Sequence, residues 1–217
     1  MATQKGLIKK TTLSAYGNPR AGGIRAINLN EGDRLISVGL TSGNHDILLG
    51  TTQGLSIRFS EEDVRPMGRV ATGVMGIRLR RGNKVISMET IAPDQRTSLL
   101  TATEHGYGKR TELSEYRRQG RGGQGIITIQ TNMRNGSVVD AFQVEPEDEV
   151  RIITASGDIV RQRVDGIRVI GRNTQGVRLI DMAEGDRVVR IARLIDKGDQ
   201  EEGLDEEVEE TDEDEIS

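Results

Sequence analysis

The chain has 217 residues and no cysteine, which excludes disulfide bonds and thiolate metal sites. Its net charge of −4 is unevenly spread: residues 196–217 hold 13 acidic residues and one lysine, leaving 29 basic and 21 acidic residues in 1–195. A body of about +8 with a tail of about −12 is typical of a polyanion binder with a disordered acidic end. The sequence lacks a signal peptide and any apolar run long enough for a membrane span, so we expect a cytoplasmic protein with no membrane partner.

A pattern of glycine and basic residues occurs four times along the chain. Each repeat has a turn glycine followed four residues later by a base, in the pairs Gly6–Lys10, Gly54–Arg58, Gly106–Arg110 and Gly157–Arg161. A second glycine, followed by isoleucine or valine, comes 17 residues later in the first repeat and 19 in the others, at Gly23, Gly73, Gly125 and Gly176. We therefore predict a domain over 1–195 built from four units, with approximate boundaries 1–41, 42–92, 93–144 and 145–195.

Each unit is predicted to contain four short strands. In the second repeat these lie near residues 47–52, 55–59, 74–79 and 84–91, with glycine supplying the positive φ of the turns. Four strands in about fifty residues is the period of a propeller blade, so we predict an all-β, propeller-like fold. The first repeat has lost most of its opening strand, and we expect its blade to be incomplete and the chain to be part of a longer array.

A glycine-rich loop that contains an arginine precedes each second glycine. The loops are PRAGGI at 19–24, GRVATGV at 68–74, GRGGQGI at 120–126 and GRNTQGV at 171–177. Arginine binds phosphate oxygens with a planar fork, and glycine allows backbone N–H groups to approach closely. We expect these loops to place positive charge at regular angles around one rim, where the charge would contact double-stranded DNA without reading its bases. Two structural alternatives remain: the loop arginines could bond carbonyls of their own blade, and the strand bases could form a solvated face.

The candidate DNA-binding residues are the loop and strand bases together with the centre of the third loop. They are Lys9, Lys10, Arg20, Arg58, Arg69, Lys109, Arg110, Arg117, Arg118, Gln119, Arg121, Gly122, Gly123, Arg161 and Arg172.

Other sequence features predict no catalytic site, metal or cofactor on this chain. The G-x-G-x-x-G match at 120–125 is followed by a strand-like segment instead of a helix, and there is no Walker A motif. His45 and His105 are isolated at predicted turns, and the acidic residues show no metal-ligand grouping. Aromatic residues are too few to provide a stacking platform for single strands.

Four segments together resemble the C-terminal domain of the bacterial DNA gyrase A subunit: NPRAGGIRAINLNEGD at 18–33, VRPMGRVATGV at 64–74, RRQGRGGQGI at 117–126 and GRNTQGVRLI at 171–180. The resemblance covers residues 3–195. It implies a β-pinwheel, usually of six blades, that wraps DNA around a basic rim and so supports negative supercoiling by an ATP-dependent type IIA topoisomerase. The implied partners are double-stranded DNA, the remainder of the gyrase A subunit, and the gyrase B subunit.

The chain departs from the family at its hallmark box, Q-[RK]-R-G-G-[RK]-G, which lies in the family's first blade. The nearest match is Gln119–Gly125, with Gly120 and Gln124 at positions where the box has bases. Its flanks resemble the second-to-last blade, so we expect the two leading blades to be missing.

Alternative interpretations are the equivalent domain of the topoisomerase IV A subunit, a protein-interaction scaffold, and RNA binding through residues 121–123. The tail at 196–217 either solubilises the chain or competes with DNA for the rim.

Overall fold

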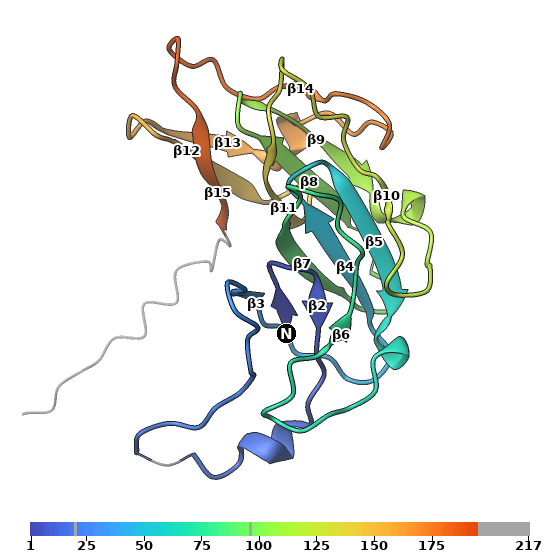
Figure 1. The fold of residues 1–217 in the computed structure, drawn as a ribbon. Coiled ribbons are helices and arrows are strands. Elements are labelled where there is room, and N and C mark those ends of the chain that lie inside the picture. The colour runs from blue at the N-terminus through green and yellow to red at the C-terminus, as the bar shows by residue number, and fades with distance from the viewer. Residues whose placement is uncertain (20, 96, 195–217) are drawn as a thin grey trace, which may run out of the picture.

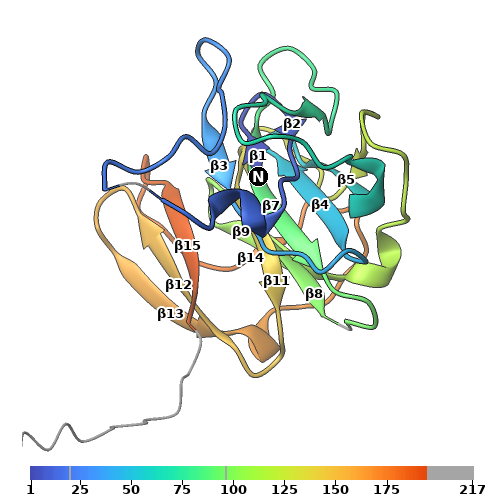
Figure 2. The ribbon, with the colours of Figure 1, turned by 90° about the horizontal axis from the view of Figure 1, so that it is seen from below.

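The computed structural model describes residues 1–19, 21–95 and 97–194. Over these ranges the chain forms fifteen β-strands and four short 3-10 helices, without an α-helix. The strands make four antiparallel sheets that follow one another in chain order, as Figures 1 and 2 show from two sides. The predicted all-β, propeller-like fold is therefore confirmed. Arg20 and the acidic tail lie outside the described residues.

Each sheet has an inner strand that contacts the inner strands of neighbouring sheets, and an outer edge that faces away from them. Given from the inner edge outward, the first sheet is β3 (Leu35–Ser37), β1 (Ala2–Thr3), β2 (Leu7–Ile8) and β6 (Val74–Met75). The second is β7 (Val85–Ile91), β4 (Asp46–Thr51), β5 (Leu55–Ser60) and β10 (Ile126–Ile127). The third is β11 (Val138–Val144), β8 (Ser98–Thr103), β9 (Tyr107–Glu112) and β14 (Val177–Arg178). The fourth is β15 (Val188–Leu194), β12 (Glu149–Thr154) and β13 (Ile159–Arg163).

The outermost strand of each of the first three sheets comes from the next repeat. The sequence led us to expect a strand near 74–79 in the second unit's own sheet, but β6 covers only two residues and pairs with β2 of the first repeat. The second glycine directs this crossing. Gly73 has a φ of +101°, and a Cβ atom there would lie 2.6 Å from the carbonyl oxygen of Ile8. Only glycine permits that approach, so the chain crosses closely over the preceding sheet.

Each of the first three sheets receives its outermost strand from the next repeat, which we call strand exchange. In the described residues, the sheet with only three strands is therefore the last one and not the first. The opening strand β1 is short, as expected, yet the first sheet still has four strands because the second repeat contributes β6. In the part of the chain that the structure describes, the three-stranded sheet is the fourth, and β13 forms its outer edge. Figure 2 shows β13 outside β12 and β15 at the rim of the molecule.

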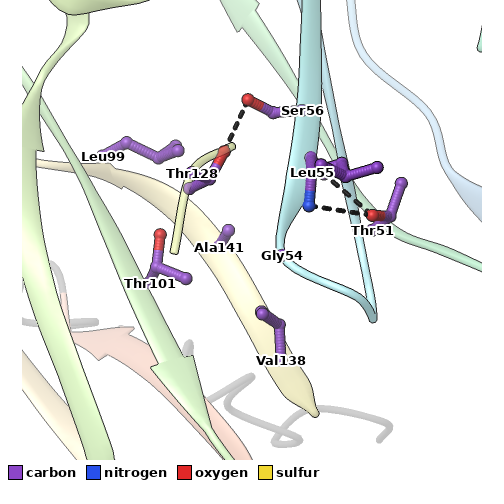
Figure 3. A pocket seen from close by; sticks show the side chains of 10 residues that line it. Thr51, Gly54, Leu55, Ser56, Leu99, Thr101, Thr128, Val138 and Ala141 are labelled. Carbon is purple, nitrogen blue, oxygen red and sulfur yellow. Dashed lines mark hydrogen bonds between the residues drawn. The ribbon is translucent and has the colours of Figure 1, made fainter. Parts of the chain in front are cut away.

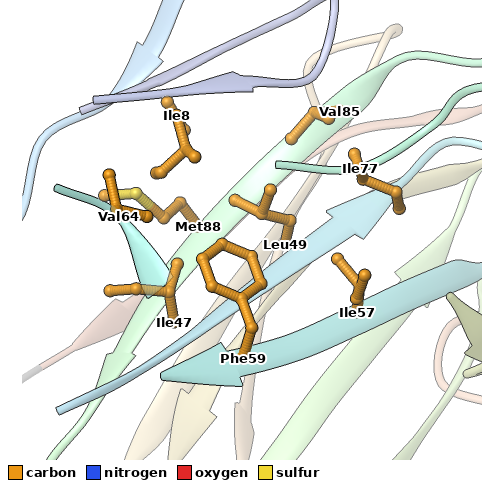
Figure 4. Packing of buried hydrophobic residues seen from close by; sticks show 10 residues of the cluster. Ile8, Ile47, Leu49, Ile57, Phe59, Val64, Ile77, Val85 and Met88 are labelled. Atoms are coloured by element: carbon orange, nitrogen blue, oxygen red, sulfur yellow. The ribbon is translucent and has the colours of Figure 1, made fainter. Parts of the chain in front are cut away.

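The hydrophobic core is shared between successive repeats. Ile8 of the first repeat packs with Leu49, Ile57 and Phe59 of the second, and all four are nearly or completely buried (Figure 4). The central strand β4 is buried along its whole length, which explains its continuous apolar run ILLG. Because each core joins two repeats, the blades stabilise one another as nearest neighbours.

The interface between the second and third blades is tightly filled. Its cavity has a volume of about 10 Å³ and is lined by residues such as Leu99, Val138 and Ala141 (Figure 3). The hydroxyl of Thr128 hydrogen-bonds to that of Ser56 at 2.6 Å across this interface. A space of this size holds about one water molecule, so it is not a substrate pocket. No helix in the described ranges is long and apolar enough to cross a membrane.

Candidate nucleic-acid interface

The base four residues after each turn glycine holds the next repeat in place. We call Lys10, Arg58 and Arg110 the clamp residues, because each donates to main-chain carbonyls around the 3-10 helix of the following repeat. These helices are η2 (Glu61–Asp63), η3 (Leu113–Glu115) and η4 (Val164–Gly166).

The clamp distances are short. The Nζ atom of Lys10 lies 2.8 Å from the carbonyl oxygen of Glu61, and a guanidinium nitrogen of Arg58 lies 3.0 Å from that of Leu113. Arg110 Nε lies 2.8 Å from the carbonyl oxygen of Ile167. Arg110 is only 8% exposed. The clamp residues therefore act between blades. Arg110 is buried, contrary to the exposed role expected from the sequence, whereas Lys10 and Arg58 are half-buried.

Arg161 occupies the same repeat position but lacks a following 3-10 helix in the described residues. Its side chain forms an ion pair with Glu149 on the neighbouring strand and is 61% exposed. Among the described residues, therefore, no carbonyl of a following 3-10 helix accepts from Arg161.

Lys9 and Lys109 are buried, and this too contradicts the expected surface location. The Nζ atom of Lys109 lies 2.6 Å from the carbonyl oxygen of Gly171 and 2.5 Å from that of Arg172. Lys9 donates in the same way to Ala26 and Arg69. Burial lowers the pKa of Lys109 to about 8 and also lowers that of Lys9. Both lysines fix the glycine-rich loop of the next repeat and are not accessible to DNA.

The loop arginines Arg69, Arg121 and Arg172 link successive loops. Each donates to the carbonyl two residues after the second glycine of the preceding repeat, over 3.3 Å to Arg25, 3.1 Å to Met75 and 2.9 Å to Ile127, respectively. One structural alternative from the sequence was that the loop arginines bond carbonyls of their own blade. They do bond carbonyls, but these carbonyls belong to the preceding repeat. Arg121 nevertheless remains exposed, and Arg69 and Arg172 remain half-exposed.

The third loop, from Gln119 to Gly125, lies along the blade beneath it through backbone contacts. The N–H of Gln119 donates to Arg58 over 2.7 Å, and the N–H of Gly122 donates to Gly76 over 2.6 Å. The carbonyl of Gly123 accepts from the N–H of Arg78 at 2.8 Å. Two of the loop N–H groups, those of Gln119 and Gly122, are therefore already occupied by contacts to the blade.

An exposed row of arginines lies two residues after the last residue of each of these 3-10 helices. Arg65, Arg117 and Arg168 lie eight residues before their respective second glycines, and all three are exposed. In the described residues their side chains form neither an ion pair nor a hydrogen bond. Each precedes the residue that bridges to the preceding blade, in the pairs Lys10–Pro66, Arg58–Arg118 and Arg110–Val169. This arginine row therefore occupies an equivalent place on three successive blades.

Arg117 was among the residues predicted from the sequence, whereas Arg65 and Arg168 were missed. Counting backwards from the second glycine would have found all three, since the spacing is constant even though the neighbouring residues differ. Arg118, which was also predicted, is exposed but pairs with Asp46 at 2.7 Å.

His105 lies in a turn as predicted, whereas His45 directly precedes β4 and its Nδ1 atom lies 3.8 Å from the Glu61 carboxylate. His105 is exposed beside the carbonyl of Arg134, and His45 contacts Ser42. No group of three potential metal ligands occurs in the described ranges.

Comparison with known proteins assigns the chain to a family. The model of the DNA gyrase C-terminal domain, a β-propeller, matches residues 1–42, 45–92, 97–145 and 148–194. The DNA gyrase A subunit of Salmonella typhimurium is 49% identical over 99% of this chain and 24% of its own length. The Escherichia coli protein is 46% identical over 93% of this chain and 23% of its own length. This chain thus spans about a quarter of these relatives.

Solved structures agree with the fold. A C-terminal domain of DNA topoisomerase IV is 27% identical with a TM-score of 0.83, over 89% of this chain and 60% of that one. A gyrase A C-terminal domain is 24% identical with a TM-score of 0.78, over 89% and 64%. Because the family model matches nearly all of residues 1–194, this chain belongs to the DNA gyrase C-terminal domain family.

Proposed function

We propose that this chain binds and bends double-stranded DNA along the outer surface marked by the arginine row. The main support is the repetition of an exposed arginine, unpaired within the described residues, at an equivalent place on three blades, at Arg65, Arg117 and Arg168. Arg121 adds charge beside the row. Phosphate contacts from such residues position DNA without selecting its sequence.

The mechanism is electrostatic. Each arginine that neutralises a phosphate releases a condensed counterion, so binding weakens steeply as salt rises. Bending a 20–30 bp site costs on the order of 1–6 kcal/mol, and several blades must contact the backbone together to offset that cost. The clamp residues and buried lysines contribute indirectly by holding each loop against the preceding blade.

We further infer that the chain is an accessory, non-catalytic part of gyrase, acting in the cytoplasm with the remainder of the gyrase A subunit and with the gyrase B subunit. Identities of 45–49% with curated gyrase A subunits support gyrase over topoisomerase IV. In that setting the bent DNA would present a segment for strand passage, and the chain would need no cofactor of its own.

The test is a salt series on two triple variants that remove equal charge. The first replaces Arg65, Arg117 and Arg168 by alanine. The control replaces Arg34, Lys84 and Arg187, which are also exposed and also share one repeat position, but lie at the inner-strand turns. We expect the first triple to reduce the slope of log affinity against log salt by about 3, at about 0.9 per lost phosphate contact.

The control should leave that slope nearly unchanged. Equal losses in both triples would mean that binding follows net charge alone. An unaltered slope in the arginine-row triple would exclude this surface as the DNA site.

A further inference from the structure

The residue that follows the arginine row differs from blade to blade. On the first and third blades it is Pro66 and Val169, and neither carries a charge. On the second blade it is Arg118, which stands directly beside Arg117 of the row. The second blade would therefore present twice the charge of its neighbours at this place if both arginines were unpaired.

A buried carboxylate, that of Asp46, binds the additional arginine. Its Oδ1 atom lies 2.7 Å from a guanidinium nitrogen of Arg118, and its Oδ2 atom lies 2.8 Å from Nε of Arg58. The side chain of Asp46 is 3% exposed, while that of Arg118 is 61% exposed. Because Asp46 begins β4 and Arg118 belongs to the next repeat, this ion pair joins two repeats.

The acid and the additional arginine occur together when the repeats of this one chain are compared. The place of Asp46, eight residues before the turn glycine, is taken in the third repeat by Ser98. The matching bridge residue on the third blade is Val169, so that blade lacks both members of the pair. Arg110 nevertheless binds its carbonyls there without an ion pair in the described residues. A clamp residue thus needs no acid, which indicates that Asp46 serves Arg118.

Burial gives Asp46 a firm hold on Arg118. A carboxylate that is kept from water loses more when a partner leaves than an exposed carboxylate does. A DNA phosphate would have to compete with Asp46 for the guanidinium of Arg118, whereas Arg117 has no partner in the described residues to give up. Of the two adjacent arginines, Arg117 is therefore the better phosphate donor.

We propose that Asp46 is a positioning residue of the DNA interface, which holds Arg118 against the second blade and leaves Arg117 as the phosphate donor at this place. The pair makes the available charge equal on three successive blades, with one unpaired arginine of the row on each. A regular spacing of single charges suits one phosphate backbone that runs from blade to blade. This inference rests on the proposed function.

The test is a salt series of duplex binding by the full chain and its variants. Asp46→Ser, which copies the third repeat, should free Arg118 for one further phosphate and make the slope of log affinity against log salt steeper by about 0.9. Arg118→Val, alone or combined with Asp46→Ser, should keep the wild-type slope. Glu112→Ser removes an exposed acid from the neighbouring blade and serves as the charge control, which should also keep that slope.

Three results would overturn the inference alone. The first is an Asp46→Ser chain with the wild-type slope. The second is an Arg118→Val chain whose slope is shallower by about 0.9, because Arg118 would then already contact DNA in the wild type. The third is equal steepening by Asp46→Ser and Glu112→Ser, which would assign the effect to net charge. A wild-type chain that binds no duplex would overturn the proposed function and this inference with it.

Urea unfolding of the same variants without DNA measures the ion pair directly. Both single variants should fold, since Arg58 keeps the carbonyls of Leu113 and Tyr116 without Asp46, and Asp46 keeps Arg58 without Arg118. The midpoint shifts of the two single variants should not add up to that of the double variant, because the two side chains interact. Additive shifts would overturn the inference. If Asp46→Ser does not fold, Asp46→Asn removes the charge with little change of shape and takes its place in both measurements.

Discussion

Replacing Arg110 and Arg161 by methionine, one at a time, compares a buried and an exposed residue at the same repeat position. Arg110 is 8% exposed and donates to the carbonyl oxygen of Ile167 at 2.8 Å. The Arg161 side chain is 61% exposed and has only its ion pair with Glu149. Methionine preserves most of the aliphatic packing but removes all the donors.

The expected loss in the free energy of unfolding depends on which hydrogen-bonding groups each substitution leaves without a partner. Arg110→Met should lower the free energy of unfolding by about 2–3 kcal/mol, since a hydrogen bond from a charged donor is worth roughly 1.5–3 kcal/mol and the Ile167 carbonyl would lose its partner. Arg161→Met should cost less than about 1 kcal/mol, the range of exposed ion pairs. A difference of about 2 kcal/mol moves the urea midpoint by roughly 1 M when m is about 2 kcal/mol/M.

Urea unfolding followed by far-UV circular dichroism measures both variants. The wild-type m-value must be retained, so that the midpoints report stability alone. Equal destabilisation by the two substitutions would refute the inter-blade role of Arg110.

Three further outcomes test other parts of the structure. Burial raises the pKa of Asp140 from 3.8 to about 6, so the folded chain binds this proton more tightly than the unfolded chain, and stability should fall by up to about 3 kcal/mol as the pH rises between those values. Asp140→Asn should make that fall smaller in urea titrations at several pH values, and the neighbouring Glu89, whose pKa burial also raises, should account for what remains. Gly106→Ala should destabilise more than Gly157→Ala in thermal unfolding, because both need a positive φ at about 1–2 kcal/mol but only Gly106 faces a carbonyl. Deleting residues 196–217 should raise DNA affinity most at low salt, and equal affinities there would exclude competition by the tail.

The turns were predictable because their signal is local. All eight glycines used to align the repeats have positive φ, including Gly54 at +71° and Gly125 at +80°. The sheet to which each short strand belongs was not predictable in the same way. The donor strands of the second, third and fourth repeats lie at the same offset from the turn glycine. Pairing within a repeat and pairing with the preceding repeat therefore predict the same sequence period.

The candidate site was predicted less well, because a regularly repeated base reveals periodicity but not exposure. Lys109 recurs as Lys9 in the first repeat, and Arg117 recurs as Arg65 and Arg168, yet Lys109 is fully buried and Arg117 is exposed. The difference arises from carbonyls of the next repeat, which surround Lys109 and are brought there only by strand exchange. Sequence alone could locate such carbonyls only if the exchange were already known.

The clamp residues and the exposed arginine row both follow from the position of each 3-10 helix over the preceding blade. The backbone carbonyls of a short 3-10 helix have no partners in a sheet. Each 3-10 helix lies over the preceding blade, where a basic side chain on a strand can donate to these carbonyls. Arg58 and Arg110 meet that need, which fixes the height and angle of each 3-10 helix. Arg117 and Arg168, which lie two residues after those helices, are thereby held outward at a set interval. The spacing of the exposed charges is therefore determined by the inter-blade clamps, so the path offered to a phosphate backbone should change when a clamp is removed.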